Sequence, residues 1–384
     1  MAIVPSTLLA ELPAIDLRRL LVRVATACVF AIGGVALFAL RWQLEGVLIY
    51  IAISNIAKLI GAELTTSVVV VNGRIGIGMY RWSPGLIAVG GVLPLLFPGS
   101  VPALLLLPVC IGMYVGIWWS LHHDLAQMLG RGTRSFQATE VIGTLVGTVI
   151  LIAVSTQFTI ATAVAVGGVF ALAGTAAKVP IDPLALQERI ASWSDEARGR
   201  ADEVVENGKM MARSVAMISF SALSCLRIEA LTGNTSILAG IVELGAVLCL
   251  AEFVVWLFTG RIPYDDSRLK VAGFSLTVIG FALIAAALNG LSGGSIGPIG
   301  VFGLGYVSVA LAARSVHRTA DQQFARASLR GVENRPGVRE RTKFRVYVFL
   351  LPLLAAPWIL PVVGVLGALM LLRCRFEGPD GATS

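Results

Sequence analysis

A series of apolar segments, each about 20 residues long, follows one another through most of the sequence. By residue number the candidate segments are 20–41, 46–71, 78–97, 101–119, 138–156, 158–178, 214–234, 236–258, 270–290 and 295–314. The stretch 345–373 adds one long segment or two short ones. Since about 20 apolar residues in a helix cross the hydrocarbon core of a bilayer, the sequence predicts an all-α polytopic membrane protein with about twelve transmembrane helices.

The composition agrees with a chain whose main partner is the lipid bilayer. Apolar residues make up 56% of it and charged residues 14%, and the mean hydropathy is +0.83, whereas soluble domains carry about 25% charged residues. The net charge of +7 is typical of basic loops on the inner face of a membrane, so no nucleic-acid partner is expected. The five cysteines are scattered, and the sequence has no P-loop, GxSxG or HExxH pattern. We expect no metal, no cofactor and no enzymatic activity.

A polar segment divides the chain into two parts. It predicts an N-terminal six-helix bundle over 1–178, a cytoplasmic linker with an amphipathic helix over 179–213, and a C-terminal bundle of five or six helices over 214–384. If the spans alternate from a cytoplasmic N-terminus, all but three of the 30 Lys and Arg fall inside. The exceptions are Arg41, Lys58 and Arg227. The positive-inside rule therefore places both termini in the cytoplasm and predicts a multi-pass protein of the bacterial inner membrane.

Two similar stretches suggest that the two parts are copies of one unit. NGRIGIGMYR begins at Asn72 and TGRIPYDDSRLK begins at Thr259, and each has Gly-Arg-Ile followed by a second Arg seven residues after the first. Each is predicted to be the inner loop after the second span of its half. The predicted fourth spans also correspond, with Gly112 and Gly303 near the middle of each. Matches in the same order and topology indicate parallel repeats of six spans.

The twelve predicted spans, the inner termini, the polar linker and the two Gly-Arg loops together resemble the major facilitator superfamily. The family's loop has a Gly, then an Asp-Arg pair, then further basic residues. The second loop matches at Gly260 and Arg268, with the acidic residue displaced onto Asp265; the first matches only at Gly73 and Arg81. The resemblance implies two six-helix bundles with an inner gate at these loops. The gate candidates are Gly73, Arg74, Arg81, Glu252, Gly260, Arg261, Asp265 and Arg268.

The first loop departs from the family at the gate itself. Ile77 and Gly78 stand where the family has its Asp-Arg pair, so the family's gating contacts are not carried over to this half. For Glu252, near the inner end of the eighth predicted span, two interpretations stay open: an ion pair with Arg261 at the inner gate, or a side chain that reaches the membrane interface.

Charged residues inside the predicted spans are candidates for substrate or coupling roles, because they are costly in a bilayer. Lys58 lies near the middle of the second span. Asn55 is on roughly the same helical face, and Glu63 is about 140° away. Lys58 either serves as a counter-charge for substrate or pairs with a carboxylate of a neighbouring span. Three further candidates are predicted to form an outer cluster: Arg227, Glu229 and Glu243.

The fourth span ends in the sequence WWSLHHD. Adjacent histidines point apart on a helix, so we expect His122, His123 and Asp124 to be solvated at the interface and not to bind a metal. Trp118 and Trp119, just before them, are typical of an aromatic belt at the membrane surface.

The resemblance implies a secondary transporter that moves a small, largely apolar or amphipathic molecule by alternating access. Proton coupling would use Glu63, Glu243 or Glu252, and the apolar lining expected of the path favours export. Two alternatives stay open. One is a scaffold or assembly factor of the same fold for a membrane complex, and the other is a flippase for a lipid-linked intermediate.

Overall fold

The computed structural model describes residues 17–27, 29, 33–128, 133–176, 182–191, 228–233, 266–290 and 296–312, together with single residues between 240 and 257. Within these ranges every element is a helix, which confirms the predicted all-α fold class. The chain forms two compact units, Met1–Ala191 and Ser192–Ser384. The boundary lies inside the polar segment 179–213, and the exact domain limits given above stay a prediction.

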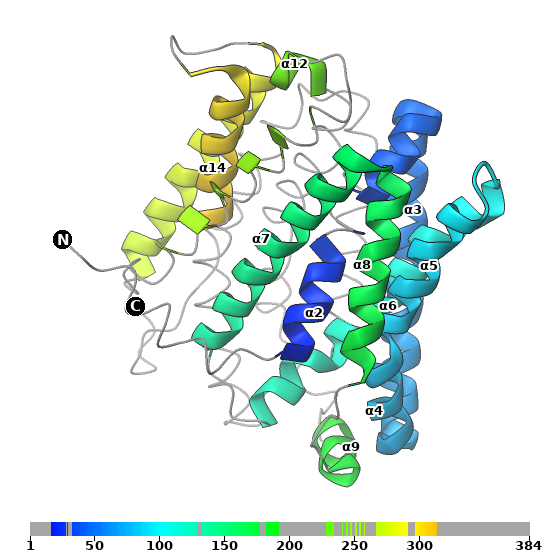
Figure 1. Cartoon of the computed structure of the whole chain (residues 1–384). Coiled ribbons are helices and arrows are strands. Elements are labelled where there is room, and N and C mark those ends of the chain that lie inside the picture. Colours follow the sequence, from blue (N-terminus) through cyan, green and yellow to red (C-terminus); the bar gives the residue numbers. More distant parts are fainter. Residues whose placement is uncertain are drawn as a thin grey trace. The chain divides into compact units, whose positions relative to one another are not determined.

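All six apolar segments predicted in the first half coincide with helices of the first unit (Figure 1). The helices are α2 (Leu17–Thr26), α3 (Gly34–Val71), α4 (Gly73–Trp82), α5 (Pro84–Leu96), α6 (Val101–Met128), α7 (Thr133–Gln157), α8 (Ile160–Thr175) and α9 (Pro183–Ala191). Helix α3 packs on α6, α5 packs on both α6 and α8, and α2 packs on both α7 and α8.

Among the described residues of the second unit, α12 (Ile228–Thr232), α14 (Asp266–Leu288), the helix Pro298–Ala312 and the single helical residues between 240 and 257 fall in predicted spans. Across both units, the helices among the described residues that are long and apolar enough to cross a membrane unaided are Glu45–Val69, Val101–His122 and Val271–Leu288. The stretch 345–373 lies outside the described residues, so the number of twelve spans stays a prediction.

The first and second spans meet within α3. Trp42 and Gln43 leave helical geometry, and Gln43 has φ of +49°. Residues before this break therefore belong to the first span, and Glu45–Val69 forms the second. Arg41 donates from one terminal guanidinium nitrogen to the carbonyl oxygen of Gly99 at 2.9 Å. This bond holds the turn between the first and second spans beside the α5–α6 turn.

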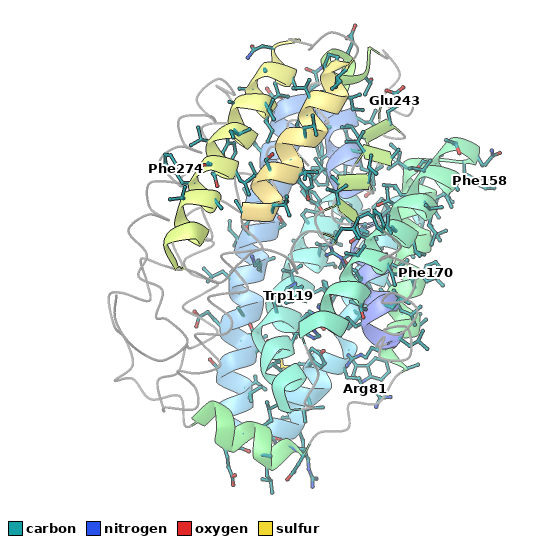
Figure 2. The ribbon with its side chains drawn as sticks, turned by 90° about the vertical axis from the view of Figure 1, so that its left-hand side faces the viewer. Arg81, Trp119, Phe158, Phe170, Glu243 and Phe274 are labelled. Carbon is teal, nitrogen blue, oxygen red and sulfur yellow. The ribbon has the colours of Figure 1, made fainter. Side chains whose placement is uncertain are left out.

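The turns of the first unit gather at its two ends, as alternating spans require. The α7–α8 turn at Phe158 lies at the end opposite Arg81 (Figure 2), and Arg41 joins the turn within α3 to the α5–α6 turn at one end. Which end faces the cytoplasm stays a prediction.

Helices α3 and α6 are in backbone contact through the sequence GMYVG of α6. A Cβ at Gly116 would overlap the carbonyl oxygen of Lys58, and a Cβ at Gly112 would overlap that of Ser54. In a bilayer, helices associate by such close packing because lipid supplies no hydrophobic force between them. The Gly-x-x-x-Gly spacing of α6 thus fixes the position of the second span.

The second unit has a related contact, made by a side chain. The position that a Cβ would take at Gly303 lies 2.7 Å from Cγ1 of Val247, a residue of the predicted eighth span. In each half, a glycine near the middle of the fourth span thus contacts the second span. The observation supports the repeat inferred from the sequence.

The stretch 72–81 was predicted to be a loop, and this prediction is wrong. It forms α4, and Asn72 alone separates α4 from α3. Asn72 has φ of −152° and caps α4, because its side-chain oxygen accepts from the backbone N–H groups of Arg74 and Ile75. Its position between two predicted spans suggested a loop, but the N-cap and the following apolar residues are sufficient for a helix.

Candidate functional site

Lys58 lies deep in the second span. In the helix Glu45–Val69 it is about 20 Å from the first residue and about 17 Å from the last, at 1.5 Å per residue. Its side chain is half-buried, and its carbonyl oxygen lies against Gly116 of α6. A cation at this depth in an apolar helix is a functional candidate by its cost alone.

The helix is regular from Asn55 to Glu63, so the angular relations predicted from the sequence apply. Asn55 and Lys58 are about 60° apart, and Lys58 and Glu63 about 140° apart, around the helix axis. The Nδ2 group of Asn55 donates to the carbonyl oxygen of Ile51 at 2.8 Å. This bond orients the amide and directs the amide oxygen of Asn55 away from its own backbone. One face of α3 therefore carries a cation beside an amide acceptor.

The two arginines of the first predicted gate loop share one face of α4, because residues seven apart are two turns apart. Arg74 is exposed. Arg81 is half-buried; its Nε donates to the carbonyl oxygen of Thr175 at 3.2 Å, and its guanidinium lies 5.5 Å from the ring centre of Trp82. Thr175 ends α8, where carbonyl groups lack helical partners. Arg81 thus binds a helix end of its own unit.

Gly73 lies where α9 crosses the beginning of α4. A Cβ on Gly73 would overlap the carbonyl oxygen of Pro183. The side chain of Gln187 bridges the turn, since it donates to the carbonyl oxygen of Val71 and accepts from the N–H of Gly73, both at 3.4 Å. Leu186 of α9 is fully buried. The glycine predicted at the gate therefore serves the docking of the linker helix.

Replacing Gly73 with alanine is expected to displace α9. The new methyl group has no space beside the Pro183 backbone, and overpacking of this kind costs about 1–3 kcal/mol. Hydrogen exchange of the Pro183–Ala191 amides, measured by mass spectrometry, should become faster. Gly78→Ala is the matched control, because nothing lies within 4 Å of the position its Cβ would take. Unchanged protection of α9 in Gly73→Ala would contradict this packing.

Only some of the candidate site residues of the second half lie in the described part of the chain. Glu229 is exposed on α12, and Glu243 is half-buried; Glu243 is labelled in Figure 2. Arg268 belongs to α14, but its side chain is outside the described part. Also outside it are Arg227, Glu252, Gly260, Arg261 and Asp265. The outer cluster and the second gate loop therefore stay predictions.

A buried aromatic cluster connects α4 to α6, and the sequence did not predict it. The rings of Tyr80 and Trp118 stack with centroids 4.5 Å apart, and those of Trp118 and His122 at 5.0 Å. The hydroxyl of Tyr80 lies 2.7 Å from Nδ1 of His122. His122 is 4% exposed and Trp118 is 3% exposed. The prediction of a solvated His122 is thus wrong, as is the placing of Trp118 in an aromatic belt, because α4 covers this face of α6. The side chains of His123 and Asp124 are outside the described part.

Arg18 of α2 extends this cluster. Its side chain is 6% exposed, and its guanidinium carbon lies 4.6 Å from the ring centre of Tyr80 and 5.1 Å from that of Trp118. Arg23, one and a half turns later, donates from Nε to the hydroxyl of Thr144 on α7 at 2.9 Å. The sequence LRRLLVR could have indicated these residues, because it places arginines at the beginning of an apolar span.

Comparison with known proteins gives the fold. No model of a protein family matches the sequence, and no curated protein matches it. The structure is similar to the xylose transporter XylE from E. coli in a partially occluded inward-open conformation, with a TM-score of 0.64 and 14% identity over 96% of this chain and 99% of that one. It is also similar to an auto-inhibited peptide transporter of the POT family, with a TM-score of 0.65 and 12% identity over 94% of this chain and 96% of that one.

A third solved structure agrees. The proton:xylose symporter XylE bound to 6-bromo-6-deoxy-D-glucose has a TM-score of 0.63 and 15% identity, with 96% of each chain covered. These likenesses extend over nearly the whole length of both chains, and the apolar helices agree with a multi-pass membrane protein. The resemblance seen in the spans and in the two Gly-Arg stretches is therefore confirmed at the level of architecture: the chain has the fold of the major facilitator superfamily.

Proposed function

We propose that this protein is a secondary transporter that moves a small amphipathic molecule across the membrane by alternating access. The observation that carries the proposal is the likeness to a xylose transporter and to peptide transporters over at least 94% of this chain. Because that likeness is one of fold, the activity itself rests on the half-buried Lys58 within the second span.

Lys58 and Asn55 are the residues of this chain to which we assign substrate contact. An ammonium group and an amide oxygen on one face of an apolar helix suit a molecule that has an anionic or hydrogen-bonding group and an apolar body. Ala52 and Leu59, both half-buried on this side of α3, would supply apolar contact. Coupling to protons would use Glu63, Glu243 or Glu252. Because an apolar path favours molecules that partition into membranes, export is the proposed direction.

The test is transport by the purified full-length protein in proteoliposomes with a pH gradient imposed in either direction. The probes are radiolabelled xylose, dialanine and the amphipathic anion taurocholate, and pyranine inside the vesicles reports proton movement. We expect taurocholate to move faster than in protein-free vesicles and to respond to the gradient. If none of the probes moves with correctly inserted protein, this proposal fails. Co-purification of a stable membrane partner would then favour the assembly-factor alternative.

A further inference from the structure

Arg18 joins the beginning of α2 to the ends of two other helices. Its Nε donates to the carbonyl oxygen of Gly174 at 3.1 Å, and one terminal nitrogen donates to those of Tyr80 and Arg81 at 3.0 and 3.1 Å. These carbonyls belong to the last turns of α8 and α4, where helices leave acceptors without intrahelical partners. A cation is also favoured there by the helix dipoles.

One of these acceptors exists because of Pro84. In a helix the carbonyl of Tyr80 would accept from the N–H of residue 84, and proline has no N–H. The hydroxyl of Ser83 and the guanidinium of Arg18 both donate to this oxygen, each at 3.0 Å. Arg18 therefore supplies a hydrogen bond that the Ser83–Pro84 junction between α4 and α5 removes from the backbone.

The aromatic cluster fixes the plane of the guanidinium. Arg18 lies over the rings of Tyr80 and Trp118, and Trp118 is itself stacked on His122. A planar guanidinium can stack on rings and donate along its edge at the same time, which the ammonium of lysine cannot do. Both the rings and the carbonyls thus select arginine at this position.

The same helix end is held a second time by Arg81. Arg81 donates to the carbonyl oxygen of Thr175, the residue after the Gly174 that Arg18 binds. The end of α4 is consequently attached to the end of α8 by two neighbouring contacts. We propose that Arg18 is a positioning residue that sets the angle of α4 at the Ser83–Pro84 junction and thereby holds the Arg74–Arg81 face in place. Its role in gating rests on the proposed transport function, whereas its role in positioning α4 does not.

Hydrogen exchange of the α4 amides in the purified full-length protein tests the positioning role. Loss of this buried donor takes away one partner of the Gly174 and Arg81 carbonyls and leaves the Tyr80 carbonyl with the Ser83 hydroxyl, so Arg18→Ala should make Gly73–Trp82 exchange at least about ten-fold faster. Arg18→Lys keeps the charge without the planar guanidinium and its several donors, and should give a smaller increase in the exchange rate. Adding Pro84→Ala to Arg18→Ala restores an N–H that the Tyr80 carbonyl can accept from, so exchange should return part of the way to the wild-type rate; the Gly174 and Arg81 carbonyls still lack the Arg18 donor.

Two matched variants control for general damage. Arg23→Ala removes another arginine of α2, one that binds α7, and Pro94→Ala removes another proline inside a helix. Neither should change exchange in α4. A residue with a purely structural role would instead raise exchange throughout the unit and lower the melting temperature without rescue by Pro84→Ala. That result, or unchanged α4 exchange in Arg18→Ala, overturns the proposal. If Arg18→Ala does not fold, the same exchange measurement is made on Arg18→Lys with and without Pro84→Ala. Faster α4 exchange in Arg18→Lys that Pro84→Ala reduces supports the proposal, and unchanged α4 exchange overturns it.

Transport is measured separately, with whichever probe the wild-type protein moves. Displacement of α4 should lower the maximal rate by at least about ten-fold and leave the KM within about two-fold, because Arg18 is not assigned to substrate contact. An equal loss in Arg23→Ala would contradict the gating role. If the wild-type protein moves no probe, the proposed function fails, and the exchange experiment still decides whether Arg18 positions α4.

Discussion

Replacing Lys58 with alanine is expected to reduce transport by at least about 30-fold, which corresponds to about 2 kcal/mol of lost interaction. Lys58 is half-buried in the middle of an apolar helix, where a charged partner is poorly screened by water. A substrate that binds through this ammonium group loses its counter-charge in the variant. The measurement is initial rate against probe concentration in proteoliposomes, with the loss expected mainly in KM for an anionic probe.

The two roles left open for Lys58 give different results. If Lys58 only pairs with a neighbouring carboxylate, Lys58→Ala should lower the melting temperature and Lys58→Arg should restore both stability and transport. If it contacts substrate, Lys58→Met should fold normally and transport poorly. Asn55→Ala should have a smaller effect, since it removes a neutral hydrogen-bonding group and not a charge. Wild-type transport by Lys58→Ala would remove this residue from the site.

Gly116→Ala is expected to destabilise the protein by about 3 kcal/mol. The methyl group would overlap the carbonyl oxygen of Lys58 on α3, and a backbone atom cannot move aside without displacing the whole helix. The expected result is a lower melting temperature in detergent and reduced recovery of monodisperse protein. Because α3 also carries Lys58, any protein that does fold should transport poorly.

Gly85→Ala provides the comparison for this prediction. Nothing lies within 4 Å of the position its Cβ would take, and alanine is favoured over glycine in a helix by about 1 kcal/mol. This variant should therefore melt at or above the wild-type temperature. A Gly116→Ala protein as stable as Gly85→Ala would show that α3 and α6 do not approach as closely as described.

The apolar spans could be predicted from the sequence because the bilayer imposes one length on every crossing helix. The same reasoning located Lys58 near the middle of its span, since helical rise converts sequence position into depth. It also placed Gly112 and Gly303 at corresponding positions, and both glycines contact the second span of their half. The lengths of the spans, the depth of Lys58 and the positions of the two glycines depend on local sequence and on length alone.

Other features could not be predicted because they depend on which helices meet. The place of residues 72–81 between two predicted spans suggested a loop, yet Asn72 caps a helix there. His122 and Trp118 would be solvated or lipid-facing on an isolated α6, and they are buried because Tyr80 and Arg18 cover them. Sequence periodicity gives the face of a helix but does not give its neighbour. For the second gate loop, Gly260, Arg261 and Asp265 lie outside the described part, and for Arg268 only its place in α14 is described.

The single residue between α3 and α4 limits what the first unit can do. One residue extends by at most about 3.5 Å, so the facing ends of these two helices cannot draw apart by more than a few ångströms. Ser83 alone separates α4 from α5, and only Phe158 and Thr159 lie between α7 and α8. With connections of one or two residues, the two helices at each of these junctions can pivot about it but cannot slide past one another. A large displacement of α3, α4 and α5 relative to one another must therefore be a rotation about their junctions.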